Sequence, residues 1–492
     1  MGEVRCALPA DPAEARVIDA DVPAAVGRVL DEVLGDRVAR ARAMDALFAE
    51  ELAGRVARFT RAGGKRLRSQ LLWWTFRACG GSGEGPVAAA VRIGAALELL
   101  QTCALVHDDV MDGSALRRGR PALHADLRTR YAGSASPGRV ARFAEAGGLL
   151  AGDLALAWSD DLMAETPLDP ATGRTVRRLW SDLRTEMVAG QYLEVQGQIT
   201  GSSSLSRALR AARLKSGRYS VERPLALGAA LAGADDATTR ALCSAGRRVG
   251  VAFQLRDDLN DVFAAPRWTG KPCGGDIREG KPTSLVALAR MRAEATGDRH
   301  ALAVLRDALG DAGLTEADLD RVREVLTRTG ARATVEDWIA RLVTRGLRDL
   351  DGARLAPEPG ARLRRLLTAA ADRTAHEAHE PPGGPHHAPD AAGSPHPDPT
   401  GHFPTGADAI ERPHPDPTSD TTHGPHPRPR PRPRPEAPCD DGDHPHPQAL
   451  SDGTDHAHPQ APPDGTGRHP RPGPGPAVSS CPSPSGGKET GR

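Results

Sequence analysis

The 492-residue sequence lacks an excess of charge of one sign, closely spaced cysteine pairs and any long apolar run. Its 64 Lys and Arg residues balance 64 Asp and Glu residues, so the net charge gives no reason to expect nucleic acid or an anionic membrane as a partner. Seven cysteines without CxxC spacing favour a reducing cytoplasm over a disulfide framework or a zinc site. Prolines and acids interrupt residues 1–20, so no signal peptide is expected there. We therefore expect a soluble, cytoplasmic protein with no integral membrane segment.

The last part of the chain has few residues that could form a hydrophobic core. From His376 onward, Pro, His, Gly, Asp and Thr replace nearly all apolar residues, and all but three of the 17 histidines lie there. Such a segment cannot bury enough apolar surface to offset the entropy of ordering it. We therefore expect a loose N-terminus over residues 1–20, one large folded domain over residues 21–375, and a disordered tail over residues 376–492.

Helical periodicity dominates the folded part. Apolar residues recur at helical spacing in segments that cover residues 22–59, 91–111, 147–163 and 184–198. No run of residues has the alternation and composition of a convincing strand. The sequence therefore predicts an all-α fold.

Three carboxylates stand at the end of one of these apolar helices. Asp108 and Asp112 are four residues apart and share a helical face, with Asp109 beside them. Each acid at a helix C-terminus costs about 0.3–1 kcal/mol, because the helix dipole is already negative there, and a bound cation removes that cost. Ligands that are all oxygen favour Mg²⁺, which also binds substrate phosphate. Arg117 and Arg118 follow, with permanently charged forks suited to phosphate.

A second acidic cluster strengthens the metal hypothesis. Alone, the first cluster would more often be a solvated helix end. Asp257, Asp258 and Asp261 repeat its spacing after another apolar approach, with Asn260 among them. Two acidic clusters that face each other would repel strongly. We therefore expect them to share metal ions that hold a polyanion.

Basic residues at three further places could also contact phosphate. RAGGKRLR combines two glycines, which allow close approach of the backbone, with Lys65 and Arg68 at the start of a helix, where anions are favoured. Lys215 precedes an apolar stretch and needs a partner of opposite charge. A Gly- and Pro-rich loop carries Lys271 and Lys281 and could close over a charged substrate. For RAGGKRLR, the alternative is a helix start whose basic residues are solvated.

In this order, the motifs resemble those of the trans-type isoprenyl diphosphate synthases (polyprenyl synthetases), and in particular the geranylgeranyl diphosphate synthases. They extend from residue 61 to residue 285 and read GGKRLR, HDDVMD with RRGRP, AGD, GQ, KSGRY, FQLRDDLND and GKPCGGDIREGKPT. The resemblance implies a helical bundle around a deep central cavity, usually as a homodimer. It also implies that the chain condenses isopentenyl diphosphate with allylic diphosphates, with three Mg²⁺ ions in each active site.

The resemblance further implies roles for individual residues. The catalytic residues would be Asp108, Asp112, Asp257 and Lys215. The Mg²⁺ ligands would come from Asp108, Asp109, Asp112, Asp257, Asp258 and Asp261. Isopentenyl diphosphate would be held by Lys65, Arg68, Gln101 and Arg118. The allylic diphosphate would be held by Arg117, Lys215, Ser216, Gln254, Lys271 and Lys281.

Two other functions remain open. A class I terpene cyclase shares the implied fold and one Asp-rich motif, but usually has neither a second motif like DDLND nor a separate isopentenyl diphosphate pocket. A catalytically idle subunit or binding protein would also keep the fold, although such chains commonly lose an acid or an arginine from these motifs. One departure from the family is Gln101, where many members have His. Gln keeps a hydrogen-bond donor but cannot become charged.

Product length should depend on how far the growing chain can extend below Asp108. Short-chain members of the family often have an aromatic residue four or five positions before that Asp, where this sequence has Ala104 and Cys103. Leu100 and Leu97, farther along the helix, would then form a lower floor. We therefore expect a C20 product, geranylgeranyl diphosphate, and a shorter product from Cys103→Phe. The alternative is that Cys103 only packs and that another helix or a dimer partner closes the cavity.

Overall fold

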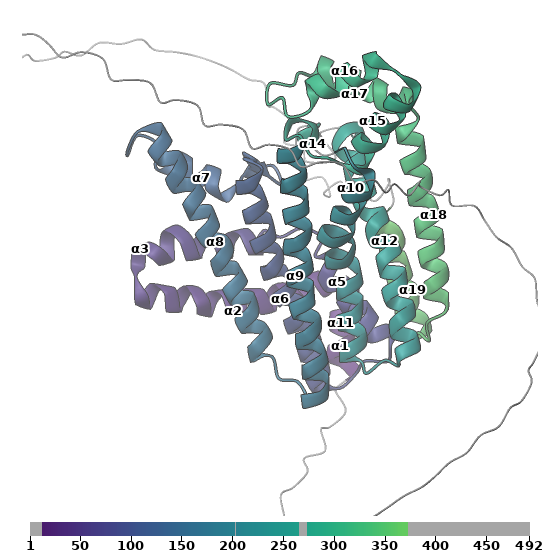
Figure 1. Ribbon diagram of the computed structural model, residues 1–492. Coiled ribbons are helices and arrows are strands. Elements are labelled where there is room, and N and C mark those ends of the chain that lie inside the picture. Colours follow the sequence, from purple (N-terminus) through teal and green to yellow (C-terminus); the bar gives the residue numbers. More distant parts are fainter. Residues whose placement is uncertain (1–11, 202, 265–272, 372–492) are drawn as a thin grey trace, which may run out of the picture. The chain divides into compact units, whose positions relative to one another are not determined.

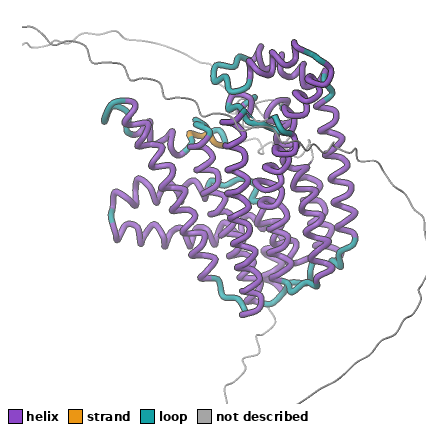
Figure 2. Tube along the Cα trace, viewed as in Figure 1, coloured by secondary structure: helices purple, strands orange, loops and turns teal. Residues whose placement is uncertain are grey.

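The computed structural model describes residues 12–201, 203–264 and 273–371, which are almost entirely helical (Figures 1 and 2). The N-terminal elements are α1 (Pro12–Ala20), α2 (Val22–Met44), α3 (Ala46–Phe48), the π-helix η1 (Ala49–Ala53), α4 (Gly54–Arg61), α5 (Leu67–Ala78) and α6 (Glu84–Met111). The middle elements are α7 (Leu123–Arg130), α8 (Pro137–Glu165), α9 (Pro170–Thr200), α10 (Leu205–Ala212), the π-helix η2 (Arg213–Glu222), α11 (Arg223–Leu231) and α12 (Asp236–Phe263). The last are α14 (Gly275–Arg278), α15 (Ser284–Thr296), α16 (Arg299–Ala308), α17 (Glu316–Arg328), α18 (Ala331–Asp351) and α19 (Pro357–Ala371). The predicted all-α fold is confirmed.

Side-chain caps fix the starts of three of the long helices. Asp21, Asp169 and Asp235 each accept hydrogen bonds from backbone amides in the first turn of α2, α9 and α12, which satisfies donors that have no partner within the helix. Gly113, just after α6, has a φ of +65°. Glycine adopts this conformation at little cost, so the chain can turn directly after the first acidic cluster.

α6 is the central helix of the fold. It packs against α8, α5 and α2, and most of its residues are buried. By length and hydropathy it could cross a membrane, but 78% of its apolar window is buried inside the protein. Such burial is also what a core helix of a folded domain shows, so the membrane signal of α6 is weak.

One short hairpin interrupts the helices, and the sequence did not predict it. Strand β1 (Leu116–Arg117) pairs antiparallel with β2 (Arg120–Pro121). In the two-residue loop between them, φ is +54° at Arg118 and +71° at Gly119, as in a type I′ turn. Positive φ is uncommon for arginine, so the loop gives the Arg118 side chain a direction that an ordinary turn would not.

The N-terminal boundary differs from the prediction of a loose segment over residues 1–20. Residues 12–20 form α1, and the side chains of Ala15 and Ile18 are buried in the main hydrophobic core. The Asp19 carboxylate accepts hydrogen bonds from the indole of Trp73 (2.9 Å) and from Arg77 on α5. These contacts stabilise a helix whose own sequence, broken by acids, gave little sign of it. The predicted tail, residues 376–492, lies outside the described residues.

Candidate active site

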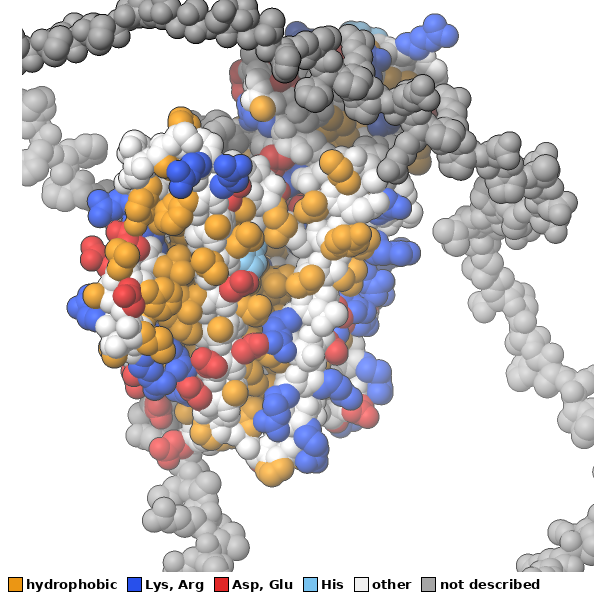
Figure 3. Space-filling view, turned by 60° about the vertical axis from the view of Figure 1, so that its left-hand side comes forward, with side chains coloured by type: hydrophobic (Ala, Val, Ile, Leu, Met, Phe, Trp, Pro, Cys, Tyr) orange, Lys and Arg blue, Asp and Glu red, His pale blue; other side chains and the backbone are white. Residues whose placement is uncertain are grey.

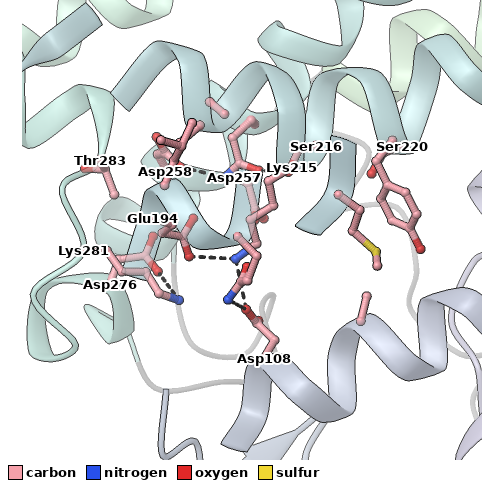
Figure 4. Close-up of a pocket in the computed structure, with 18 of the residues that line it drawn as sticks. Asp108, Glu194, Lys215, Ser216, Ser220, Asp257, Asp258, Asp276, Lys281 and Thr283 are labelled. Carbon is pink, nitrogen blue, oxygen red and sulfur yellow. Dashed lines mark hydrogen bonds and ion pairs between the residues drawn. The ribbon is translucent and has the colours of Figure 1, made fainter. Parts of the chain in front are cut away.

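A single cavity of about 800 Å³ brings together the two acidic clusters and most of the predicted basic residues. Its walls come from α6, α9, α10, η2 and α12, and from the segment that links α14 to α15. Figure 4 shows Asp108 on one side of the cavity, opposite Asp257 and Asp258, with Lys215 between them. Segments far apart in the sequence therefore converge on one polar region.

Lys215 lies at the centre of this polar region. Its ammonium group donates to Asp108 Oδ1 (2.9 Å) and to Glu194 Oε1 (2.7 Å). Burial would lower the pKa of Lys215, but the carboxylates of Glu194 and Asp108 raise it, so the lysine stays charged. Gln191 Nε2 also donates to Asp108 Oδ1 (3.0 Å). Asp108 is thus held by three side chains, since Arg117 lies 3.5 Å from its other oxygen.

Lys281 makes the equivalent contacts at the other end of the first acidic cluster. Its ammonium group lies 2.7 Å from Asp112 Oδ2, 2.7 Å from Glu279 Oε2 and 3.4 Å from Asp276 Oδ1. Burial would lower the pKa of Lys281, but Asp276 and Asp112 raise it well above its usual value. The second predicted lysine of this loop, Lys271, lies outside the described residues.

The second acidic cluster has an excess of negative charge. Burial, together with the nearby carboxylate of Asp276, raises the pKa of Asp261 to about 8 and raises the pKa of Asp258 as well. Asp258 accepts a hydrogen bond from Gln254 Nε2 (2.8 Å), and Gln254 in turn accepts one from the hydroxyl of Ser216. Asp257 lies exposed on the cavity wall.

The donor chemistry of the two clusters fits a hard divalent cation. Among the described residues, no three His, Cys, Asp or Glu side chains are close enough to bind an ion as they stand. The raised pKa values of Asp258 and Asp261 nevertheless indicate carboxylates that a cation would stabilise in the charged form. Because the carboxylates offer only oxygen ligands, they favour Mg²⁺ over zinc or copper.

Asp109 is directed differently from its neighbour Asp108. Its side chain is fully buried and accepts two hydrogen bonds from Arg117, one of 2.8 Å from Nε. It does not line the cavity, whereas Arg117 does. The contacts of Asp109 are those of a residue that orients Arg117, so the structure gives no support to its predicted role as a metal ligand.

The residues predicted for isopentenyl diphosphate form a second group. Arg68 donates to the Ser220 hydroxyl (2.6 Å), and its guanidinium lies 4.6 Å from the centre of the Tyr219 ring. The Tyr219 hydroxyl donates to Gln101 Oε1 (2.9 Å). These side chains line the cavity, whereas Lys65 and Arg118 do not.

Arg118 and Lys65 belong to the rim near the glycine pair. Arg118 donates to the carbonyl of Ala62 (3.2 Å), and its guanidinium lies so close to Gly64 that a Cβ there would be 3.6 Å from Nη2. Lys65 is exposed. Arg118 therefore lies along the backbone of the predicted phosphate motif, at ordinary van der Waals distance from Gly64.

Only one of the three predicted chain-length residues lines the cavity. Ala104 lines the cavity one helical turn before Asp108, but Cys103 and Leu100 do not line it. The Cys103 thiol faces the ring of His107 (3.7 Å to Nδ1), and burial raises its pKa to about 12. The prediction that Cys103 controls the depth of the cavity is therefore not supported by its orientation.

Several site residues were missed from the sequence. Glu194, Asp276, Glu279 and Tyr219 all contact predicted site residues. The sequence places Glu194 on one helical face with Gln191 and Gln198, but this polar face gave Glu194 no assigned role. The position of Tyr219 could not be deduced in this way, because η2 does not have α-helical spacing.

Comparisons with known proteins agree with this geometry. A family model described as polyprenyl synthetase matches residues 49–325, which is more than half of the chain. A geranylgeranyl diphosphate synthase from Methanosarcina mazei is 29% identical over 298 residues, covering 60% of this chain and 82% of the relative. A farnesyl diphosphate synthase from Geobacillus stearothermophilus is 36% identical over 240 residues, covering 46% and 72%. Other relatives are named geranylfarnesyl and nonaprenyl diphosphate synthase, so the relatives differ in product length.

A solved structure is similar over most of the chain. The geranylgeranyl pyrophosphate synthase from Corynebacterium glutamicum, complexed with isoprenyl diphosphate and magnesium, has a TM-score of 0.68 and is 34% identical. The similarity covers 71% of this chain and 98% of that structure.

Proposed function

We propose that this chain, which belongs to the polyprenyl synthetase family, is a head-to-tail prenyltransferase that condenses isopentenyl diphosphate with an allylic diphosphate. The main support is the cavity in which Asp108 faces Asp257, with Lys215 and Lys281 beside them. Two acidic clusters and two charged lysines are what one bound diphosphate and its metal ions require. The relatives described above, which are named as prenyl diphosphate synthases, support the same class of reaction.

We assign the metal ligands to the acids that line or adjoin the cavity. Asp108 on α6 and Asp112 directly after it, with Asp257, Asp258 and Asp261 on α12, would hold Mg²⁺, three ions in the expected complement. When bound, Mg²⁺ supplies Lewis-acid stabilisation of the negative charge that develops on the departing diphosphate.

The basic and amide side chains would bind and orient the two substrates. Lys215, Lys281, Arg117, Ser216 and Gln254 would hold the allylic diphosphate, and Lys271 is assigned there by resemblance alone. Arg68, Gln101, Lys65 and Arg118 would hold isopentenyl diphosphate on the other side. The allylic carbon–oxygen bond breaks, its electron pair leaves with the diphosphate, and the double bond of isopentenyl diphosphate attacks the resulting cation. The proton lost in the last step goes to the departed diphosphate, so no side-chain base is required.

We propose a C20 product, geranylgeranyl diphosphate. Ala104 leaves the cavity open one turn below Asp108, about 6 Å along the helix. Met187 of α9 also lies on the cavity wall, one helical turn before Gln191, which contacts Asp108. Met187, in place of Leu100 and Leu97, is our candidate for the floor.

We also propose that the protein is a homodimer. Hydrophobic side chains gather on the face of the molecule shown in Figure 3. Exposed large hydrophobic residues occur on α8 and α9, and they include Leu149 (47% exposed), Leu150 (58%), Val188 (62%), Tyr192 (68%) and Ile199 (85%). A second copy of the chain would remove this apolar surface from water.

One assay distinguishes the proposed function from its alternatives. Purified protein is incubated with Mg²⁺, farnesyl diphosphate and isopentenyl diphosphate, and the products are dephosphorylated and chromatographed. We expect geranylgeraniol, and no hydrocarbon when isopentenyl diphosphate is omitted. A cyclic hydrocarbon formed from farnesyl or geranylgeranyl diphosphate alone would identify a terpene cyclase. No product under either condition would indicate the idle subunit.

A further inference from the structure

The backbone that carries Lys215 is unusual, because η2 is a ten-residue π-helix. π-helical segments are rare, usually short, and frequent at functional sites. Four residues of η2 contact the site: Lys215 reaches Asp108, Ser216 reaches Gln254, Tyr219 reaches Gln101 and Ser220 reaches Arg68. The location of this helix therefore sets the geometry of both substrate groups.

Gly190 of α9 is in direct contact with the backbone of η2. A Cβ atom added at Gly190 would lie 2.3 Å from the Lys215 backbone nitrogen and 2.7 Å from its Cα. Carbon atoms in contact normally lie about 3.5–4.0 Å from their neighbours, so any side chain at residue 190 would displace the Lys215 backbone by about 1 Å. Gly190 is buried between α9 and η2, so a side chain added there could not turn outward into solvent.

The same face of α9 continues to the second lysine. Glu194, one turn after Gly190, accepts the 2.7 Å hydrogen bond from Lys215. Gly197 lies on the next turn, where an added Cβ would be 2.8 Å from Cγ of Pro282, the residue after Lys281. At these two positions without a side chain, α9 thus touches the Lys215 backbone and the ring of Pro282, the residue that follows Lys281.

We propose that Gly190 is a positioning residue that sets the location of Lys215, and that Gly197 has the same role for Lys281. The inference rests on the proposed function, since these lysines are assigned to the allylic diphosphate. With the backbones of α9 and η2 in contact at Gly190, Lys215 Nζ lies 2.9 Å from Asp108 and 2.7 Å from Glu194. A displacement of about 1 Å in a catalytic group can cost about 100-fold in rate.

The test measures binding of an unreactive allylic ligand and so does not depend on turnover. The ligand is farnesyl thiolodiphosphate, in which sulfur replaces the bridging oxygen, with Mg²⁺ present, and its Kd is measured by calorimetry. We expect Gly190→Ala and Gly197→Ala each to raise this Kd at least tenfold. Because Gly197 contacts Pro282 and not η2, Gly197→Ala should change the Kd of isopentenyl diphosphate less than twofold. The matched control is Gly228→Ala, where an added Cβ would be 2.4 Å from the Leu72 carbonyl oxygen, at the contact of α11 with α5. Gly228→Ala should lower Tm about as much as Gly190→Ala does, but it should not change the Kd of the allylic ligand.

Double variants show whether each glycine acts through its own lysine. In a Lys215→Ala background, Gly190→Ala should have no further effect on Kd, whereas in a Lys281→Ala background it should have its full effect. Gly197→Ala should show the reverse pattern. The inference would be overturned if Gly190→Ala raised the Kd of the allylic ligand by the same factor in the Lys215→Ala background. It would also be overturned if Gly228→Ala lowered the affinity for this ligand as much as Gly190→Ala does. If the wild-type protein elongates allylic diphosphates but Gly190→Ala binds the ligand with a normal Kd, only this inference is overturned. If the wild-type protein elongates no allylic diphosphate, the proposed function itself is overturned.

Discussion

At the scale of single residues, neighbours in the sequence have different roles because a helix points them to different sides. Asp108 faces the cavity, while Asp109 is fully buried against Arg117. Ala104 lies four residues before Asp108 and shares its face, while Cys103 lies five residues before it and faces His107. The cluster of acids could be identified from the sequence. The direction of each side chain could not, because it depends on how α6 packs against its neighbouring helices.

Asp108→Asn and Asp257→Asn should each lower kcat/KM for prenyl transfer by about 10²–10³ or more, because each removes charge that stabilises the leaving diphosphate. Helical content, measured by circular dichroism, should not change. The control is Asp161→Asn on α8, a half-exposed acid 4.0 Å from Arg37, which should keep full activity. Normal turnover in either Asp108→Asn or Asp257→Asn would disprove the metal assignment.

Ala104→Phe should shorten the dominant product by one isoprene unit, because the new ring would fill the cavity one turn below Asp108. Cys103→Phe is the matched control. Its side chain points away from the cavity, so it should lower stability by about 1–3 kcal/mol through overpacking without changing product length. Chromatography of the dephosphorylated alcohols reads out both variants. A shorter product from Cys103→Phe alone would restore the original interpretation of this position.

At the scale of elements, the long helices were predictable and the π-helix η2 was not. Apolar periodicity and capping aspartates such as Asp235 identify α-helices from local sequence. In η2 the geometry is determined by close contacts with other helices: Gly190 of α9, and Gly250 of α12, where an added Cβ would be 2.3 Å from the Gly217 carbonyl oxygen. Contacts between segments so far apart in the sequence leave no periodic signal.

Glu186 joins η2 and α11 to α9, and we expect Glu186→Gln to destabilise the fold by about 2 kcal/mol. Its carboxylate binds Arg223 (2.8 and 2.7 Å) and Arg218. Burial opposes the charged form, but Arg223 and Arg218 lower the pKa of Glu186 below its usual value. A lowered pKa means that the stabilisation is present above about pH 4.5 and is lost as pH falls through the folded-state pKa. The difference between wild type and Glu186→Gln should therefore shrink in acid.

Urea unfolding at neutral and at acidic pH measures this effect. The control is Asp182→Asn, whose half-exposed carboxylate lies 3.5 Å from Arg223 and should contribute less than about 0.5 kcal/mol. Equal stability of Glu186→Gln and wild type at neutral pH would show that the cluster does not stabilise η2.

At the scale of the whole molecule, the fold class and the site chemistry could be predicted, but the limits of the folded part and its outer surface could not. α1 was missed because its contacts with Trp73 and Arg77 are made more than fifty residues away. The exposed apolar residues of α8 and α9 have the periodicity of an ordinary buried face. Only the positions of the assembled helices show whether an apolar face packs inside one chain or stays exposed on its surface.

Truncation after Ala375 should leave prenyl transfer and Tm nearly unchanged. The described folded part ends with α19 at Ala371, and Leu363 and Leu367 of that helix are buried in the main core. The control is a truncation before Pro357, which removes α19 and should abolish folding. Loss of activity in the chain truncated after Ala375, measured with the same assay, would show that residues beyond it contribute to the working enzyme.

The apolar face of α8 and α9 gives the last prediction, which concerns the oligomeric state. If a second chain covers this face, Leu150→Glu and Ile199→Glu together should bury two carboxylates in each half of the interface, at a cost of several kcal/mol, and the dimer should dissociate. Light scattering should then change from twice the chain mass of 51.8 kDa to the mass of one chain. Met291→Glu on α15, which replaces another half-exposed apolar side chain, should remain a dimer.

Because Val188 and Tyr192 belong both to this face and to the cavity wall, dissociation should also expose one side of the cavity to water and lower kcat. A wild-type protein with the mass of a single chain would contradict the dimer, and the cavity wall at these two residues would then have to be complete without a partner.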